Sequence, residues 1–155
     1  MNVSFTKYNE EFLAKSYQWL SDAEIKYLTN TPPITRRSQK EWFQKLPLRT
    51  DYLIWGICKD GEPIGAVGLK HIDSYNKIGE YFGYIGEKRF WGMGVGKLMI
   101  SFIETKAKEL SLSTLQLVVR TSNHRAIHLY VKSGFAVDNH SSNEPSDFIT
   151  MTKTI

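Results

Sequence analysis

The spacing of apolar positions predicts helices in the first third of the chain. Residues 10–20 fit a helix. The runs 21–24 and 38–41 both have the form Ser-x-x-Glu. This is a capping box, in which each side chain bonds the other residue's backbone amide, and it marks a helix start. Short helices are therefore expected from about 21 to 28 and from about 38 to 45. Pro32 and Pro33 break the chain between them.

Beyond residue 50 the apolar residues alternate or cluster in short runs, which is typical of strands. The runs 52–58 and 63–71 are joined by Lys59-Asp-Gly-Glu62, a hairpin turn signal. The other expected elements are a strand at 80–86, a helix at 96–110, a strand at 114–120, a helix at 123–133 ended by Gly134, and strands at 135–138 and 147–155. The polar run 139–146 is expected to form a mobile loop.

This order of elements predicts an α+β fold around a mixed, mainly antiparallel sheet. The strands at 80–86 and 114–120 are separated by a crossover helix, so we expect them to run parallel. No repeat or linker divides the sequence. Residues 1–155 are expected to form a single domain.

Composition narrows the class of protein. The chain is 41% hydrophobic and 23% charged, values that are ordinary for a globular protein. No apolar stretch approaches the ~20 residues that span a bilayer, and the N-terminus lacks the pattern of a signal peptide. The single cysteine, Cys58, lies in an apolar run and is expected to be a buried thiol. A cytoplasmic protein with no membrane partner is expected. The net charge of +4 is mild.

The run Arg89 to Met99 carries the most specific chemistry. Gly92, Gly94 and Gly96 alternate there, directly before a helical pattern. Glycines let backbone amides approach a ligand, and a helix start adds free N–H groups and a positive dipole end. Such a corner binds phosphate. The glycine spacing does not fit the Gly-x-x-x-x-Gly-Lys-Ser/Thr loop that binds nucleoside triphosphates. It also does not fit the Gly-x-Gly-x-x-Gly fingerprint that binds dinucleotides.

Two motifs together resemble the GNAT superfamily of acyl-CoA-dependent N-acetyltransferases. The family's Gln/Arg-x-x-Gly-x-Gly/Ala loop fits Arg89-x-x-Gly92-x-Gly94 or Trp91-x-x-Gly94-x-Gly96. We prefer the second register because Gly96 then directly precedes the expected helix. It also matches the Trp-Gly-x-Gly variant of the branch resembling ribosomal-protein and amino-sugar acetyltransferases. The segment from Asn123 to Phe135 resembles the family's Asn-x-x-Ala-x-x-Leu-Tyr-x-Lys-x-Gly-Phe pattern at every stated position.

The resemblance implies acetyl-CoA as co-substrate, no metal, helices on both faces of the sheet and a splayed parallel strand pair. The pantetheine arm is expected to enter the splay and bond to strand backbone, while the glycine corner binds the pyrophosphate. Asn123 would bond the arm, cap the helix, or do both. The implied cofactor-binding residues are Tyr84, Ile85, Gly86, Trp91, Gly92, Met93, Gly94, Val95, Gly96, Lys97, Asn123 and Arg125.

Two catalytic residues are implied. Tyr130 is the expected acid for the leaving thiolate, with a core aromatic as the alternative. Glu80 is the expected base, acting directly or through water, with a solvated strand-end carboxylate as the alternative. His71 and His128 are weaker candidates. Attack without a dedicated base stays open, because positioning alone supplies much of a rate.

The sequence gives the least information about the acceptor substrate. Trp19 is expected to bind substrate, because amino-sugar-nucleotide members have a similarly placed aromatic. The preferred acceptor is a small primary amine, such as a nucleotide-linked amino sugar. A protein N-terminus or ribosomal protein is the first alternative, and a non-catalytic module that binds CoA or nucleic acid is the second. Nucleic acid is the less expected partner, and a homodimer is compatible with the sequence.

Overall fold

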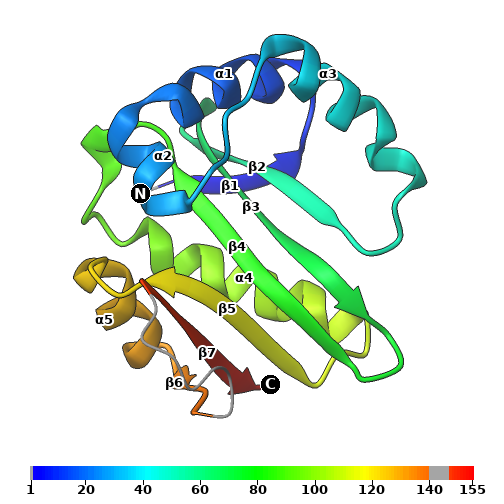
Figure 1. Cartoon of the computed structure of the whole chain (residues 1–155), viewed down its shortest axis with the longest axis vertical. Coiled ribbons are helices and arrows are strands. Elements are labelled where there is room, and N and C mark those ends of the chain that lie inside the picture. Colours follow the sequence, from blue (N-terminus) through cyan, green and yellow to red (C-terminus); the bar gives the residue numbers. More distant parts are fainter. Residues whose placement is uncertain (1, 140–146) are drawn as a thin grey trace.

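The computed structural model describes residues 2–139 and 147–155, which form a seven-stranded sheet in the order β1-β2-β3-β4-β5-β7-β6. Its helices cover both faces (Figure 1). The α+β class, the mainly antiparallel sheet and the flanking helices are therefore confirmed. The expected loop at 139–146 lies, from residue 140 on, outside the described residues.

The N-terminal part contains one strand and three helices. The elements are β1 (Val3–Lys7), α1 (Glu10–Ser21), α2 (Ala23–Thr29), α3 (Arg36–Lys45) and a 3-10 turn at Leu46–Leu48. The sequence did not predict β1. Only two of its five residues, Val3 and Phe5, are apolar and pack toward the core, which is too short a pattern to recognise.

Both predicted capping boxes are wrong in register. Asp22 caps α2 by accepting bonds from the amides of Glu24 and Ile25, while Ser21 ends α1. Thr35 caps α3 in a reciprocal box with Ser38, so Ser38 is the third helical residue and not the cap. The extended backbone of Thr35, with φ −124° and ψ 164°, suits an N-cap.

The remainder of the sheet follows the predicted order. The elements are β2 (Leu53–Lys59), β3 (Glu62–Asp73), β4 (Ile78–Ile85), a 3-10 turn at Lys88–Phe90, α4 (Val95–Glu109), β5 (Thr114–Arg120), α5 (His124–Lys132), β6 (Ala136–Val137) and β7 (Phe148–Thr154). Helix α4 begins at Val95 with Gly94 as its N-cap, two residues earlier than the preferred glycine register required. Gly96 therefore lies inside the first turn.

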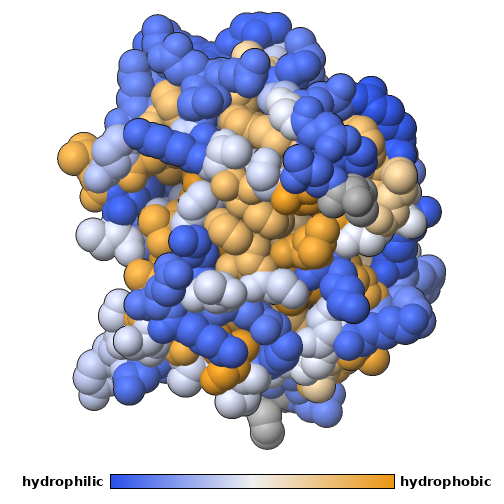
Figure 2. Space-filling model, turned by 180° about the vertical axis from the view of Figure 1, so that it is seen from behind, coloured by the Kyte–Doolittle hydropathy of each residue, from blue (hydrophilic) through white to orange (hydrophobic). Residues whose placement is uncertain are grey.

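Two hydrophobic cores lie on opposite faces of the sheet. One joins α4 to the inward side chains of β2, β3 and β5, and includes Val67, Ile103 and Leu117. The other joins α1 and α2 to the opposite face, and includes Phe12 and Ala66. Neighbouring residues such as Ala66 and Val67 serve different cores because side chains alternate along a strand. Polar side chains surround the apolar surface that gathers on the far side of the molecule (Figure 2).

Ser16 of α1 ties the second core to the sheet. Its hydroxyl oxygen accepts hydrogen bonds from Tyr8 at 2.8 Å and from Tyr84 of β4 at 2.9 Å. Ser16 is 1% exposed. Burial raises the pKa of Tyr8 to about 12 and that of Tyr84 further, so both phenols are neutral donors at ordinary pH.

Replacing Ser16 with Ala should lower the free energy of unfolding by about 1–3 kcal/mol, because two buried hydroxyls lose their acceptor. Urea unfolding measures this. Ser21→Ala on the same helix is the control, because the Ser21 hydroxyl is exposed and bonds only the Tyr17 carbonyl. The control should stay within about 0.5 kcal/mol of the parent. Equal losses in the two variants would contradict the role of Ser16.

Candidate active site

A cleft of about 1230 Å³ opens where β4 and β5 part. The two strands pair in parallel only from Ile78↔Thr114 to Glu80↔Gln116, and no pairing follows. Figure 1 shows the gap widening from that point toward α2. Each strand keeps its other neighbour, since β4 pairs with β3 as far as Ile85 and β5 pairs with β7 as far as Arg120. The expected splayed parallel pair is thus present.

The edge of β4 that faces the cleft is unpaired backbone. Main-chain groups alternate between the two edges of a strand. The Gly86 amide bonds Ile64 of β3, and the Tyr84 carbonyl lies against Gly65 of β3. The main chain of Tyr81, Gly83 and Ile85 is therefore turned toward β5. The Ile85 carbonyl accepts the indole N–H of Trp91 at 2.8 Å, which ends the open edge.

The glycine corner closes one end of the cleft. Gly92 and Gly94 have φ of +74° and +86°, a region that disfavours side chains, and nothing lies within 4 Å of where a Cβ would be. No side chain of the described residues caps α4. The amides of Val95, Gly96 and Lys97 thus begin a 15-residue helix without a side-chain acceptor, and all three residues line the cleft. These amides and the helix dipole suit an anion.

Two cationic side chains stand beside this corner. Lys97 and Arg125 line the cleft, and neither has an ion-pair partner among residues 2–139 and 147–155. Arg125 lies over the Trp91 ring, 5.7 Å from its centroid. Lys88 lies at the same distance from that ring, but Asp22 and Glu24 hold its ammonium at 2.9 and 3.0 Å. The two unpaired cations are available to a phosphate group.

Tyr130 of α5 lies near the vertex of the cleft, the point after Glu80 and Gln116 at which β4 and β5 stop pairing. Its ring packs edge-on against Tyr81 and Phe135 at 6.0 and 5.9 Å. No described residue forms a hydrogen bond with its hydroxyl. In the described part of the chain, every fully buried side-chain nitrogen or oxygen has a hydrogen-bond partner. The hydroxyl oxygen therefore reaches the cleft. Desolvation raises the pKa of Tyr130 to about 12, so the phenol keeps its proton at neutral pH.

Glu80 lies at the same vertex from the other face of the sheet. It is 7% exposed and belongs to the last residue pair that joins β4 to β5. Its carboxylate accepts a hydrogen bond from Gln116 Nε2 at 3.3 Å, and lies 3.5 Å from Lys70 Nζ and 3.2 Å from His71 Nδ1. Because Glu80 and Tyr81 are consecutive, the carboxylate and the Tyr130 ring approach one vertex from opposite faces.

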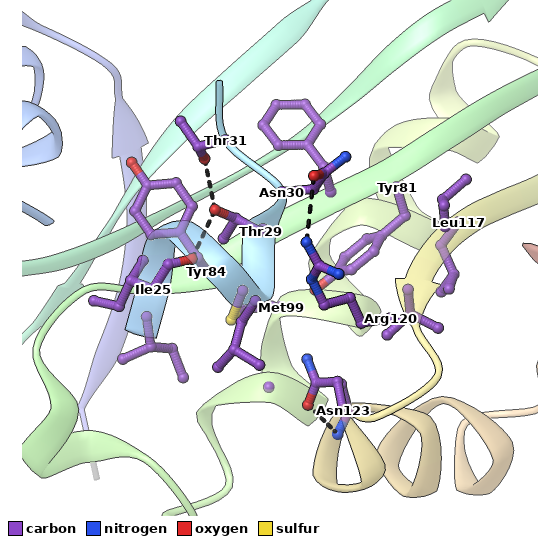
Figure 3. A pocket seen from close by; sticks show the side chains of 18 of the residues that line it. Ile25, Thr29, Asn30, Thr31, Tyr81, Tyr84, Met99, Leu117, Arg120 and Asn123 are labelled. Atoms are coloured by element: carbon purple, nitrogen blue, oxygen red, sulfur yellow. Dashed lines mark hydrogen bonds between the residues drawn. The ribbon is translucent and has the colours of Figure 1, made fainter. Parts of the chain in front are cut away.

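Helix α2 is fixed across the far mouth of the cleft by Arg120, the last residue of β5. The Arg120 guanidinium donates to the Tyr27 carbonyl at 2.6 Å and to Asn30 Oδ1 at 3.5 Å. It also stacks 4.0 Å from the centroid of the Tyr27 ring. Figure 3 shows Arg120 and Asn30 joined in this way, with Asn123 below them. This contact joins residues about ninety positions apart, and no spacing in the sequence indicates it.

Most predicted site residues line the cleft, and three do not. The indole of Trp19 is 5% exposed, lies against Gly86 and donates to Glu87 Oε2 at 2.7 Å, so it is a core side chain outside the cleft lining. The Gly86 amide donates its hydrogen bond to the Ile64 carbonyl of β3, so it is not open to the cleft. Met93 is 48% exposed and lies outside the cleft lining. Among the strand residues, the open main chain is centred on Gly83 instead of Gly86.

Asn123 takes the expected position at the start of α5. Its side-chain oxygen caps the helix by accepting the Ala126 amide at 3.3 Å. Its amide nitrogen has no partner among the described residues and faces the cleft that it lines. The cap is therefore present, and the nitrogen is free to bond a ligand.

Comparison with known proteins identifies the family. Residues 13–135 match the Acetyltransferase (GNAT) family. The chain belongs to this family. The family expected from the glycine corner and the Asn123 segment is confirmed, and so is the class of enzyme, an acetyltransferase. One curated member, the uncharacterised N-acetyltransferase YdgE of Bacillus subtilis, is 31% identical over 93 residues. This match spans 58% of this chain and 59% of that protein.

Several solved GNAT structures share the fold. The spermidine N-acetyltransferase of Vibrio cholerae, in complex with CoA and spermine, has a TM-score of 0.88 at 19% identity and covers 98% of this chain and 95% of its own. PaiA N-acetyltransferase of Thermoplasma acidophilum, in complex with coenzyme A, has a TM-score of 0.78 at 18% identity and full coverage of both chains. The Escherichia coli ribosomal-protein-S18-alanine N-acetyltransferase has a TM-score of 0.72 at 18% identity, over 99% of this chain and 94% of its own.

These GNAT relatives differ in what their names say they acetylate, so the acceptor must be inferred from this chain's own cleft. None of its described helices is long and apolar enough to cross a membrane. No group of His, Cys, Asp and Glu in the described ranges is arranged to hold a metal ion. The expected homodimer and the cytoplasmic location stay predictions.

Replacing Arg120 with Lys should loosen α2, because an ammonium keeps the charge but loses the planar stack and the fork of donors. Amide hydrogen exchange at residues 27–31 should rise about fivefold, the effect of losing ~1 kcal/mol locally. Arg37→Lys, whose side chain forms an exposed pair with Glu41 on α3, is the control and should leave this segment unchanged. Unchanged exchange in Arg120→Lys would show that the contact does not hold α2.

Proposed function

We propose that this protein transfers the acetyl group of acetyl-CoA to the primary amine of a small molecule. The observation that carries the proposal is the vertex between β4 and β5. There, an unpaired strand edge, the Tyr130 phenol and the buried Glu80 carboxylate all line one cleft. A module that only binds CoA or nucleic acid has no need of such a phenol and carboxylate.

The chain's residues fit the two polar parts of acetyl-CoA. The amides of Val95, Gly96 and Lys97 would bind its pyrophosphate, and the Lys97 and Arg125 side chains would neutralise further phosphate charge. The open edge at Gly83 would bond the amides of the pantetheine arm as a neighbouring strand does. The free nitrogen of Asn123 would bond the same arm. Acetyl-CoA supplies a thioester, whose acyl carbon an amine attacks.

Glu80 and Tyr130 would divide the proton transfers of the reaction. A primary amine is protonated at neutral pH and must lose a proton before it attacks. Glu80 accepts that proton. Tyr130, which keeps its own proton to a pKa of about 12, donates to the sulfur as it leaves. If positioning of the two substrates alone supplied the rate, substitution of either residue would leave kcat nearly unchanged.

The acceptor side of the cleft favours a small amine with one positive charge. Its wall includes Trp42, Tyr52 and Phe82, with the Tyr52 and Phe82 rings 5.2 Å apart. Among the described lining residues only Glu24 and Glu80 are acidic, and Glu24 already pairs with Lys88. A polyamine needs several carboxylates, so this wall suits a monoamine with a flat or apolar body. A nucleotide-linked amino sugar is a further small-amine candidate, because it presents a single amine and its base can stack on an aromatic wall.

A protein N-terminus is the second candidate acceptor. It would have to enter past α2, whose C-terminal end Arg120 ties to β5. An α2 held in this place favours the small amine. Thiol release from acetyl-CoA, measured with a panel of aromatic monoamines, amino sugars, polyamines and peptides, separates the classes.

Gly94→Val should weaken CoA binding at least about tenfold. The valine side chain would enter the space in front of the α4 amides, and a residue with a side chain disfavours the φ of +86° found here. Gly61→Val is a matched control, because Gly61 has φ +83° and equally open surroundings but lies in the β2–β3 turn. Both variants should lose about 1–2 kcal/mol of unfolding free energy. Calorimetric titration with CoA should separate them. Equal dissociation constants would remove the glycine corner from the binding site.

Tyr130→Phe should lower kcat about 100-fold while the dissociation constant of CoA stays within about twofold, because only the acid is lost. In the parent enzyme this phenol should cause no alkaline loss of rate below about pH 11, since its raised pKa keeps it protonated there. Tyr75→Phe is the control, because that side chain is 92% exposed. A kcat in Tyr130→Phe equal to that of the control would exclude the acid role.

A further inference from the structure

Strand β3 contains an irregularity directly opposite Glu80. Lys70 pairs with Glu80 and the next pair is Asp73 with Ile78, so β3 holds one residue more than β4 between these pairs. Such an extra residue is a β-bulge, which re-aims side chains. The strained residue of the bulge is His71, whose φ is +50°. This left-handed conformation is strained for a non-glycine residue.

The bulge brings two consecutive side chains onto one carboxylate. In a regular strand Lys70 and His71 would point to opposite faces of the sheet. Here Lys70 Nζ lies 3.5 Å from Glu80 Oε2, and His71 Nδ1 lies 3.2 Å from Glu80 Oε1. The Glu80 side chain is 9% exposed and that of His71 is 65% exposed. The imidazole therefore connects a buried carboxylate directly to solvent.

We propose that His71 relays protons from Glu80 to bulk water, as a positioning residue that acts through Glu80 and never touches the acceptor. The inference rests on the proposed function, in which Glu80 is the base. The acceptor's ammonium gives a proton to the Glu80 carboxylate and becomes a neutral amine. The carboxylic acid passes that proton to the His71 ring. The imidazolium releases a proton to water, and Glu80 is again a carboxylate.

The surroundings of the pair fit a relay better than a purely structural contact. Glu80 faces Lys70 and His71 from β3 and the neutral Gln116 from β5. Asp51, held by Arg49 at 3.0 Å, is the further carboxylate that interacts with His71. Lys70 already supplies a positive charge to Glu80, so charge balance does not require the histidine. What the ring adds is a contact between the buried carboxylate and solvent, and a strained backbone position holds it there.

The test uses His71→Gly, because glycine accepts a φ of +50° and removes only the ring. Unfolding free energy should not fall, while kcat with the best amine of the panel should drop about tenfold or more in weak buffer. Added imidazole should restore kcat in this variant and leave the parent unchanged. His71→Asn, which also tolerates this backbone, should stay slow and respond to imidazole less, because its side chain still fills part of the space.

Control variants separate this relay from the other roles. Lys70→Met removes the other contact to the same carboxylate, and any loss of kcat there should not respond to imidazole. A His71→Gly enzyme with parental kcat, or one whose loss imidazole does not restore at any pH, overturns the relay. Glu80→Gln distinguishes the two proposals. If it is slow while His71→Gly is not, only the relay fails. If it keeps parental kcat, the base and the relay fail together.

Discussion

The site depends on the loss of pairing between two parallel strands. β4 and β5 share hydrogen bonds only as far as Glu80 and Gln116, and each then remains paired with its outer neighbour alone. Unpaired backbone inside a protein must find a partner, because an unsatisfied N–H or C=O group is costly. Here the Trp91 indole satisfies the last carbonyl of the β4 edge, and the rest opens on the cleft. A ligand with its own amides would complete the sheet.

The same divergence brings side chains from both faces of the sheet to one cleft. Consecutive residues of β4 present to opposite faces of the sheet, so Glu80 lies with the N-terminal helices while Tyr81 packs against Tyr130 of α5. Only where the sheet is open can groups from the two faces reach a common space. The glycine corner lies at the start of α4, the helix that connects the two strands. This strand–corner–helix–strand unit contains Glu80 and the free helix amides, while Tyr130 comes from α5, the next helix along the chain.

The parts of this site that could be predicted from sequence are the local ones. The glycine corner and the segment from Asn123 to Tyr130 each lie within a short run, so their spacing shows their geometry. The bulge at His71 could not be predicted, because histidine carries no sign of a left-handed backbone. The contact of Arg120 with Tyr27 depends on the folded sheet. The position of Trp19 could not be predicted, because aromatic residues look the same in sequence whether they pack on a glycine, as Trp19 does on Gly86, or line a cleft.

The most direct measurement is a crystal structure of the protein soaked or grown with acetyl-CoA. The account predicts the pantetheine arm between β4 and β5, its amides bonded to the main chain near Gly83, its pyrophosphate on the amides of Val95 to Lys97, and its sulfur beside the Tyr130 hydroxyl. A gap that stays empty while the cofactor lies elsewhere on the molecule would contradict it.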